Sequence, residues 1–275
     1  MTTGERIAKA RKHKNLTQEK LAEILGISPQ AVSSWERDEY LPDTKNLIAL
    51  ADALDVTLDS LLREDPGWKL NAVNYNFSHM FTFVKGRAQI YGMLQTLKVL
   101  DMLRMAHGNQ KRKSKYGFET TYMVHPLTMA CHALAMGLKD DNVIAACLAH
   151  DMVEDSRDPA LKPEDLPVNE TVREAVRLVS KNLYDHSKPD WEKTYFAEIR
   201  KNPLACLIKC LDRVNNLAGM ADAYDRAWMV RYTAETDRYY PELLEVVKKV
   251  PEWNDAWWLM RYQMMSLLET FKRIL

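Results

Sequence analysis

The chain has 275 residues, of which 47% are hydrophobic and 28% are charged, as in ordinary globular proteins. Its formal net charge is zero, so overall charge does not indicate a nucleic-acid or membrane partner. At about 100–200 residues per domain, this length favours two domains. Nine glycines are few for the length, and apolar residues recur with the helical period. We therefore expect an all-α protein, with a small N-terminal domain followed by a larger all-helical one.

The four cysteines lie singly in apolar stretches, and none forms a CxxC pair. This usage predicts buried, reduced thiols, and a metal site at Cys206 and Cys210 would lack a second pair of ligands. No apolar run approaches the ~18 residues of a membrane span, and the basic N-terminus has no apolar signal-peptide core. We therefore expect a cytoplasmic protein with no membrane partner.

Residues 1–65 are expected to form a domain of five short helices. Gly26 ends the second helix and supplies the backbone freedom of a tight turn. Ser28 caps the third helix through its side-chain oxygen. The breaker cluster at 64–67 predicts the domain boundary, and the second domain is expected over 75–275.

Apolar residues lock the second and third helices together across the Gly26 turn. The outer face of the third helix can then enter a DNA major groove. Polar side chains on that face, and one that opens the second helix, can bond base edges or phosphates. These candidate DNA contacts are Gln18, Gln30, Ser33, Ser34 and Arg37.

The pattern from Leu16 to Glu36 resembles the Cro/C1-type (XRE) helix-turn-helix family, and the resemblance spans nearly all of residues 3–64. It implies binding to double-stranded DNA, usually as a dimer on a palindromic site. Phosphate contacts are expected mostly from the first helix and the turn after it, where basic residues concentrate. The alternative is a protein-interaction domain that has lost DNA binding.

The second domain begins with a long helical pattern over 75–106, and the polar, basic residues 107–121 are expected to form a loop. The last segment, 252–275, is an amphipathic helix rich in Trp and Met. It is expected to face the core or a partner helix, and we expect a homo-oligomer. Five more helices are expected between them, near 125–137, 141–153, 169–181, 191–219 and 222–249.

Imidazoles and carboxylates recur through the second domain in an order that can hold a metal ion. Mixed nitrogen and oxygen ligation suits Mn²⁺, Fe²⁺ or Zn²⁺ better than Ca²⁺. Such an ion can lower the pKa of a bound water to about 7 and can neutralise a phosphate oxygen. Two further acids lie just after the second ligand pair, where a base and a proton carrier would be needed. The candidate ligands are His125, His150, Asp151 and Asp212, and the two acids are Glu154 and Asp155.

The order His, His-Asp, Asp resembles the HD phosphohydrolase signature. The fuller pattern over about 85–250, including Asp212-x-x-x-Asn216, resembles the hydrolase domain of the RelA/SpoT alarmone family and its small stand-alone hydrolases. The resemblance implies removal of the 3′-pyrophosphate of (p)ppGpp, with Mn²⁺ as the expected metal. It makes Asn216 a substrate or ribose contact and matches Tyr239 to a tyrosine near the nucleotide. It also places Arg112 and Lys113 as a basic pair that grips phosphates.

The loop before His125 departs from the stand-alone hydrolases, because it is slightly longer and residues 119–122 read Glu-Thr-Thr-Tyr instead of Gly-x-Pro-Tyr. The substrate therefore stays open between ppGpp and another nucleotide, such as a deoxynucleotide phosphate or NADPH. A transcriptional regulator whose HD domain senses a nucleotide is a further alternative, although the intact Glu154 and Asp155 favour an enzyme. The domain pairing also allows an antitoxin-like or phage-defence role. A bifunctional enzyme with a synthetase domain after residue 275 is not expected.

Overall fold

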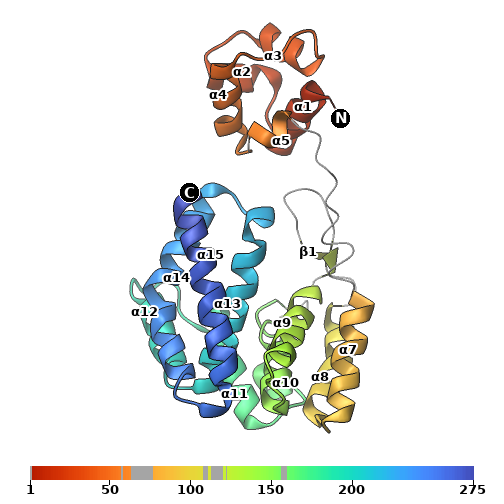
Figure 1. The fold of residues 1–275 in the computed structure, drawn as a ribbon, viewed down its shortest axis with the longest axis vertical. Helices are drawn as coiled ribbons and strands as arrows, with labels where there is room; N and C mark the ends of the chain where they lie inside the picture. The colour runs from red at the N-terminus through yellow and green to blue at the C-terminus, as the bar shows by residue number, and fades with distance from the viewer. Residues whose placement is uncertain are drawn as a thin grey trace. The chain divides into compact units, whose positions relative to one another are not determined.

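The computed structural model describes residues 2–56, 58–62, 77–107, 111–112, 120–121, 123–155 and 160–275. The chain divides into two compact units, Met1–Asn71 and Ala72–Leu275, and both are built from helices (Figure 1). Within these described residues, the only β structure is an antiparallel ladder of β1 (Lys111–Arg112) and β2 (Thr120–Thr121). The prediction of an all-α fold is confirmed, and the ladder lies in the segment that we expected to form a loop.

The first unit contains the five short helices that the sequence predicts: α1 (Thr3–His13), α2 (Gln18–Leu25), α3 (Pro29–Glu36), α4 (Thr44–Leu54) and α5 (Leu58–Leu62). The Thr17 hydroxyl caps α2 and the Ser28 hydroxyl caps α3, each by accepting a backbone N–H. Gly26 ends α2 with φ of 66°, the left-handed conformation that glycine adopts without strain. Leu21 on α2 and Val32 on α3 are fully buried in the core of this unit, so the two helices are fixed against each other.

The second unit contains nine α-helices among its described residues. They are α7 (Phe77–Ile90), α8 (Leu94–His107), α9 (Val124–Ala135), α10 (Asp141–Ala149), α11 (Glu170–Val179), α12 (Trp191–Ile199), α13 (Pro203–Ala223), α14 (Arg226–Val247) and α15 (Asn254–Ile274). Single 3₁₀ turns are η1 (Pro163–Asp165), η2 (Lys181–Leu183) and η3 (Pro251–Trp253).

Two of the long helices expected from the sequence are each divided in the structure. The prediction of one helix over 75–106 is wrong, because Gly92 takes φ of 66° and the chain turns back to pack α8 against α7. The prediction of one helix over 191–219 is also wrong, because Pro203, which has no backbone N–H to donate, opens α13 as a new helix. Asn202 caps α13 by accepting the Ala205 N–H at 3.0 Å.

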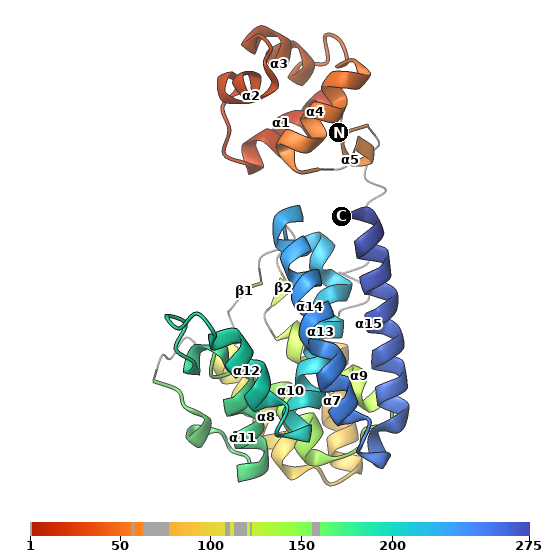
Figure 2. The same ribbon diagram turned by 90° about the vertical axis from the view of Figure 1, so that its left-hand side faces the viewer.

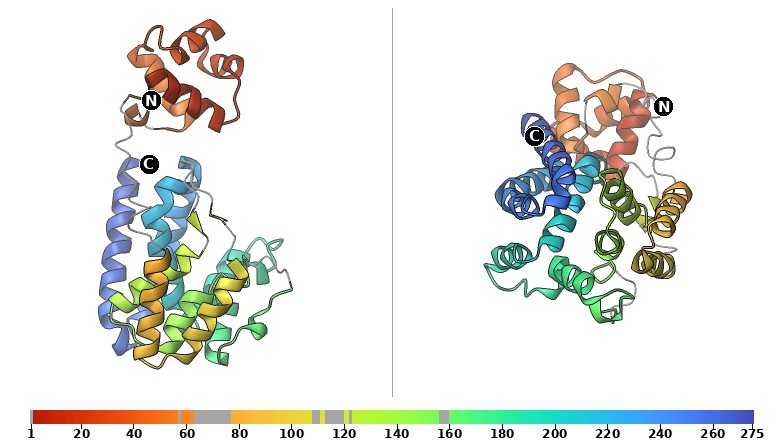
Figure 3. Two further views of the ribbon diagram at one scale, coloured as in Figure 1. Left: turned by 90° about the vertical axis from the view of Figure 1, so that its right-hand side faces the viewer. Right: turned by 60° about the horizontal axis from the view of Figure 1, so that its bottom comes forward.

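Helix α13 organises the second unit, because it packs against α9, α10, α11, α12, α14 and α15. Figure 2 shows α13, α14 and α15 side by side, and Figure 3 shows α7 and α8 beside α9 and α10. Every residue from 204 to 214 is buried. A charged residue in that stretch of α13 is therefore held inside the protein.

A buried carboxylate fixes α10 against α8. The Asp141 side chain accepts the backbone N–H groups of Gln95 and Thr96, both at 2.9 Å, at the start of α8. These donors have no partner within their own helix, so the carboxylate satisfies them. Because α10 leads directly into His150, this anchor also positions the first residues of the candidate site.

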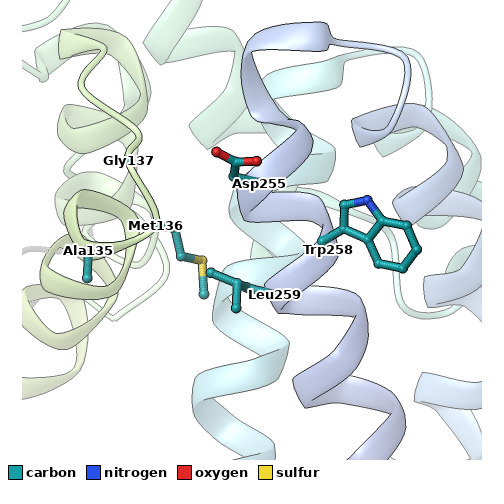
Figure 4. A pocket seen from close by; sticks show the side chains of 6 residues that line it. All are labelled: Ala135, Met136, Gly137, Asp255, Trp258 and Leu259. Carbon is teal, nitrogen blue, oxygen red and sulfur yellow. The ribbon is translucent and has the colours of Figure 1, made fainter.

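The Trp- and Met-rich helix α15 presents two different faces. It buries Trp257, Met260 and Met264 in the core, whereas Trp258 and Tyr262 are 60% and 72% exposed. A pocket of about 500 Å³ lies beside the exposed face, between the start of α15 and the end of α9 (Figure 4). Its lining residues are Ala135, Met136, Gly137, Asp255, Trp258 and Leu259. In the part of the chain that the structure describes, no helix has the length and apolar character needed to cross a membrane.

Candidate metal centre

Three helices of the second unit bring buried polar side chains to one point. His125 lies in the first turn of α9, His150 follows the last residue of α10, and Asp212 lies in the buried stretch of α13. All three are at most 6% exposed, and each offers a ligand atom within 4.8 Å of the others. Residues 87 positions apart in the sequence thus form one compact cluster, because α9 and α10 pack against α13.

The structure brings the four candidate ligands together. The Nε2 atom of His125 lies 3.2 Å from Oδ1 of Asp212 and 3.7 Å from Oδ2 of Asp151. The Nε2 atom of His150 lies 3.0 Å from Oδ2 of Asp151 and 3.9 Å from Oδ1 of Asp212. Two imidazole nitrogens and two carboxylate oxygens therefore face a common centre.

The hydrogen bonds of His150 fit a metal ion at that centre. Its Nδ1 lies 2.9 Å from the carbonyl oxygen of Cys147, which accepts the ring N–H and leaves the lone pair on Nε2. This Nε2 is buried and has no hydrogen-bond partner. Two carboxylates beside this Nε2 favour a positive charge at the centre, so these residues fit a divalent metal.

The electrostatics of the cluster also call for positive charge. Burial disfavours a charged His150, but the carboxylates of Asp151 and Asp212 outweigh it and raise the pKa of His150 to about 9. Burial likewise opposes ionisation of Asp151, yet the His150 imidazole lowers its pKa to about 2. For Asp212, Lys209 and the histidines overcome burial and hold the carboxyl pKa well below its usual range. Both aspartates therefore stay ionised.

Asn216 contacts a candidate ligand. It lies one turn after Asp212 on α13 and donates its side-chain N–H to Oδ1 of Asp212. On the other side, Nζ of Lys209 donates to Oδ2 of Asp212 at 3.3 Å. Both oxygens of this carboxylate are thus held in place, which fixes the direction in which Asp212 presents its charge.

Glu154 and Asp155 lie in a turn after α10, and not on the helix itself as we expected. Helix α10 ends at Ala149, and the expected helix to residue 153 is wrong at this end. The Glu154 carboxylate accepts the backbone N–H of Lys181 at 3.0 Å. Burial raises the pKa of Glu154, against the opposing effects of this hydrogen bond and of Lys209. Asp155 is exposed and donates its backbone N–H to the carbonyl of Asp151 at 2.9 Å.

The other candidate substrate contacts lie on different segments of the second unit. Tyr239 on α14 faces α12, where its ring stacks on Phe196 at 4.2 Å and its hydroxyl donates to Glu192 at 3.2 Å. Arg112 lies in β1, opposite Thr120. Lys113 lies outside the described residues.

On the first unit, the candidate DNA contacts differ in exposure, and some of them already form hydrogen bonds within the protein. Gln30 on α3 is exposed. Arg37 is exposed too, but its guanidinium donates to Glu39 at 2.8 Å and to Ser33 at 2.5 Å. Ser34, on the same helix, is half-buried.

Gln18 is part of an internal hydrogen-bond network. Its amide donates to Glu36 at 2.7 Å, and Glu36 also pairs with Arg11 at 2.6 Å. This network joins α1, α2 and α3, so Gln18 helps to hold the helices together beside any contact that it makes outside the protein.

Residues 7–61 match the helix-turn-helix family model. The first unit is a helix-turn-helix domain. Within it, the chain is 44% identical over 62 residues to repressor protein C2 of Salmonella phage P22, which covers 22% of this chain and 29% of that protein. It is 48% identical over 54 residues to the transcriptional regulator DicA of Escherichia coli, covering 20% of this chain and 40% of that protein. The chain thus spans less than half the length of either relative.

The second unit shares its fold with a solved structure described as a metazoan ortholog of SpoT that hydrolyzes ppGpp. The likeness has a TM-score of 0.50 at 19% sequence identity and covers 64% of this chain and 94% of that one. The helix-turn-helix domain is too short to account for this coverage, so the shared fold includes the second unit. At this identity the likeness shows the fold.

Three charged residues around the cluster have no role in the sequence-based prediction. Lys209 and Arg213 flank Asp212 on α13, and both are buried. Charged residues at inward positions of an otherwise apolar helix are the signal that could have found them. Lys181 comes from η2, a separate segment that reaches the site only in three dimensions, and its local sequence contains no such signal.

Proposed function

We propose that the second unit is a metal-dependent phosphohydrolase of a phosphorylated nucleotide, and that its substrate is ppGpp, which loses its 3′-pyrophosphate. The observation that carries the proposal is the buried convergence of His125, His150, Asp151 and Asp212, with Nε2 of His150 turned into their centre. The fold shared with a ppGpp hydrolase supports the choice of substrate class.

In this proposal, His125, His150, Asp151 and Asp212 hold a divalent metal, which we propose to be Mn²⁺. The ion supplies Lewis acidity to water and to phosphate oxygens. Asn216 and Lys209 keep the Asp212 carboxylate in its orientation from both sides. The burial of His125, His150 and Asp212 strengthens their charge interactions.

Glu154 acts as the general base in this proposal. Its raised pKa makes it a better proton acceptor than a glutamate of ordinary pKa, and the Lys181 N–H holds its carboxylate in place. A water oxygen forms a bond to the phosphorus while Glu154 takes its proton, and the bond to the ribose 3′ oxygen breaks. Asp155 accepts this proton from Glu154 and passes it to that oxygen. We propose that Arg112, Lys113 and Tyr239 contact the nucleotide, with Asn216 near its ribose.

We propose that the helix-turn-helix domain binds double-stranded DNA through Gln30, Ser33, Ser34 and Arg37, with Gln18 at the start of α2. The match to phage and bacterial repressors supports this. Arg37 would exchange its contact with Glu39 for a phosphate or a base edge when DNA arrives. Hydrolysis and DNA binding in one chain would link a nucleotide signal to transcription in the cytoplasm.

We also propose that the chain pairs with a second copy of itself through the exposed face of α15. Trp258, Tyr262 and Met265 recur along this face and are 60%, 72% and 41% exposed. The first turn of α15 is acidic at Asp255, and its last turn is basic at Lys272 and Arg273. Two antiparallel copies would bring opposite charges together at both ends of an apolar centre. Such a dimer would supply two recognition helices for a palindromic site.

The test is turnover of ppGpp by the purified full chain with Mn²⁺, with Glu154→Gln and Asp151→Asn as matched controls. We expect pyrophosphate release that both variants abolish. Asp151→Asn should also lose Mn²⁺ binding by calorimetry, whereas its binding to duplex DNA at low salt should be unchanged. Bound Mn²⁺ without turnover would reject ppGpp as the substrate and favour a regulator that senses a nucleotide. Full turnover by Asp151→Asn would reject the ligand assignment.

A further inference from the structure

Lys181 contacts Glu154, and the proposed mechanism does not use its ammonium group. This lysine lies in η2. Its backbone N–H donates to the Glu154 carboxylate at 3.0 Å, and its side chain is 27% exposed. One residue therefore contacts the proposed base through its backbone and keeps part of its side chain exposed to solvent.

The ammonium group of Lys181 shares an aromatic ring with a second ammonium. Its Nζ lies 5.6 Å from the centre of the Tyr195 ring, and Nζ of Lys209 lies 5.8 Å from the same centre. Tyr195 is fully buried, and its hydroxyl donates to the carbonyl of Val179 at 2.8 Å. The position of the ring is therefore fixed, and both ammonium groups make cation–π contacts with it.

Among the described residues, the carboxylates of Asp212 and Glu235 near these cations already form ion pairs with basic side chains. Lys209 pairs with Asp212 at 3.3 Å, and the buried Arg213 pairs with Glu235. Glu235 approaches Lys181 with 3.9 Å between Oε2 and Nζ, which is too long for a hydrogen bond, and the Glu154 carboxylate adds a weaker attraction. Burial and the charge of Lys209 lower the pKa of Lys181, so its ammonium lacks full compensation by the protein.

We propose that Lys181 binds a phosphate group of the substrate and places it next to Glu154. An anionic ligand would supply the negative charge that Lys181 lacks, and the exposed part of the Lys181 side chain gives the ligand access. Because the same residue holds Glu154 through its backbone, the phosphate and the base would be set at a fixed spacing. The inference rests on the proposed function for the identity of the substrate, but not for the class of ligand, which is a phosphate or pyrophosphate anion.

The experiment is calorimetric titration of inorganic pyrophosphate into the full chain saturated with Mn²⁺, with a blank titration into buffered Mn²⁺. It compares the wild type with Lys181→Met, Lys181→Arg and Lys188→Met. Lys188 is an exposed lysine of the same segment and serves as the matched control. We expect Lys181→Met to weaken pyrophosphate binding by about tenfold or more, as for loss of one charge-assisted hydrogen bond. Lys181→Arg should retain part of the affinity, and Lys188→Met all of it.

Two further readouts separate this role from a structural one. The affinity for Mn²⁺ and the thermal midpoint of Lys181→Met should match the wild type, because Glu235 lies beyond hydrogen-bond distance of the ammonium and methionine keeps the apolar part of the side chain. Equal pyrophosphate affinity in Lys181→Met and the wild type would overturn the proposal, and so would the absence of pyrophosphate binding by the wild type. If pyrophosphate binding depends on Lys181 but ppGpp is not hydrolysed, the phosphate site stands and the proposed substrate fails.

Discussion

At the scale of single residues, Arg213 illustrates how the second unit accommodates charge inside its core. The side chain is 1% exposed, and its guanidinium lies 3.6 Å from the centre of the Tyr232 ring and 4.3 Å from that of Tyr240. It donates to Thr236 at 3.0 Å and pairs with Glu235. The two faces of a planar cation are thus covered by aromatic rings while its edge is hydrogen-bonded, an arrangement that an ammonium group would not reproduce.

Removal of Arg213 should therefore destabilise the second unit strongly. We expect Arg213→Ala to lower the free energy of unfolding by about 3–5 kcal/mol, because it leaves Glu235 buried without its partner and opens a cavity between two tyrosines. The measurement is urea unfolding followed by circular dichroism. Arg238→Ala, at an exposed arginine of α14, should change the free energy by less than about 0.5 kcal/mol. Similar losses for the two variants would contradict this account.

The pKa of Glu154 leads to a prediction about pH. A general base works only when it is deprotonated, and burial raises the pKa of Glu154 above the ordinary value of about 4.3. We therefore expect kcat/KM to fall as the pH decreases, with the midpoint of this acid limb above that value. The pH profile of ppGpp hydrolysis measures it. An acid limb that persists unchanged in the residual activity of Glu154→Gln would show that another group controls it.

At the scale of elements, the turn between α7 and α8 shows how one backbone conformation overrides a continuous helical pattern. Gly92 has φ of 66°, and a Cβ added there would meet nothing within 4 Å. Gly86 has equally open space around an added Cβ, but it lies inside helix α7. The two glycines therefore differ in backbone conformation and not in packing, and both belong to the second unit.

The same substitution at these two glycines should have opposite effects. Gly92→Ala should destabilise the second unit by about 1–2 kcal/mol, because alanine resists the left-handed conformation. Gly86→Ala should stabilise it by about 0.5–1 kcal/mol, because alanine loses less backbone entropy in a helix. Urea unfolding of both variants beside the wild type measures the difference. Changes of the same sign would show that packing, and not backbone conformation, dominates at one of the sites.

At the scale of the whole molecule, the chain combines a helix-turn-helix domain with a unit that has the fold of a ppGpp hydrolase. The exposed face of α15 carries large apolar side chains that the core of the second unit does not bury. Burial of Trp258 and Tyr262 against a second copy would remove a large apolar area from water, which is the main driving force of association.

Dimerisation through this face should be sensitive to one added charge. We expect the wild type to be a dimer by light scattering and Tyr262→Glu to be a monomer, because it places two like charges near the two-fold axis. Ile90→Glu is the control, since Ile90 on α7 is also 72% exposed. A dimer that survives Tyr262→Glu, or that Ile90→Glu disrupts, would reject α15 as the interface.

The amino-acid sequence alone determines much of the first unit, because its elements depend on local interactions. The Gly26 turn and the caps at Thr17 and Ser28 depend on interactions over three or four residues. Their positions can therefore be predicted from the sequence. The helix breaks at Gly92 and Pro203 were missed, although both residues are visible, because a continuous apolar pattern on either side of them favours one long helix. The order His, His-Asp, Asp also predicts candidate metal ligands, because histidines and aspartates in that order are uncommon in apolar helices.

Only the tertiary structure decided which side chains meet. The packing of α9 and α10 on α13 sets the distances among His125, His150, Asp151 and Asp212, and no local rule contains them. The same holds for Lys181, which reaches Glu154 from a separate segment, and for Tyr239, which the packing of α12 turns toward Phe196 and Glu192. The physical reason is that sequence patterns report the period of one element, whereas a site depends on the relative placement of several, which the burial of the whole core determines.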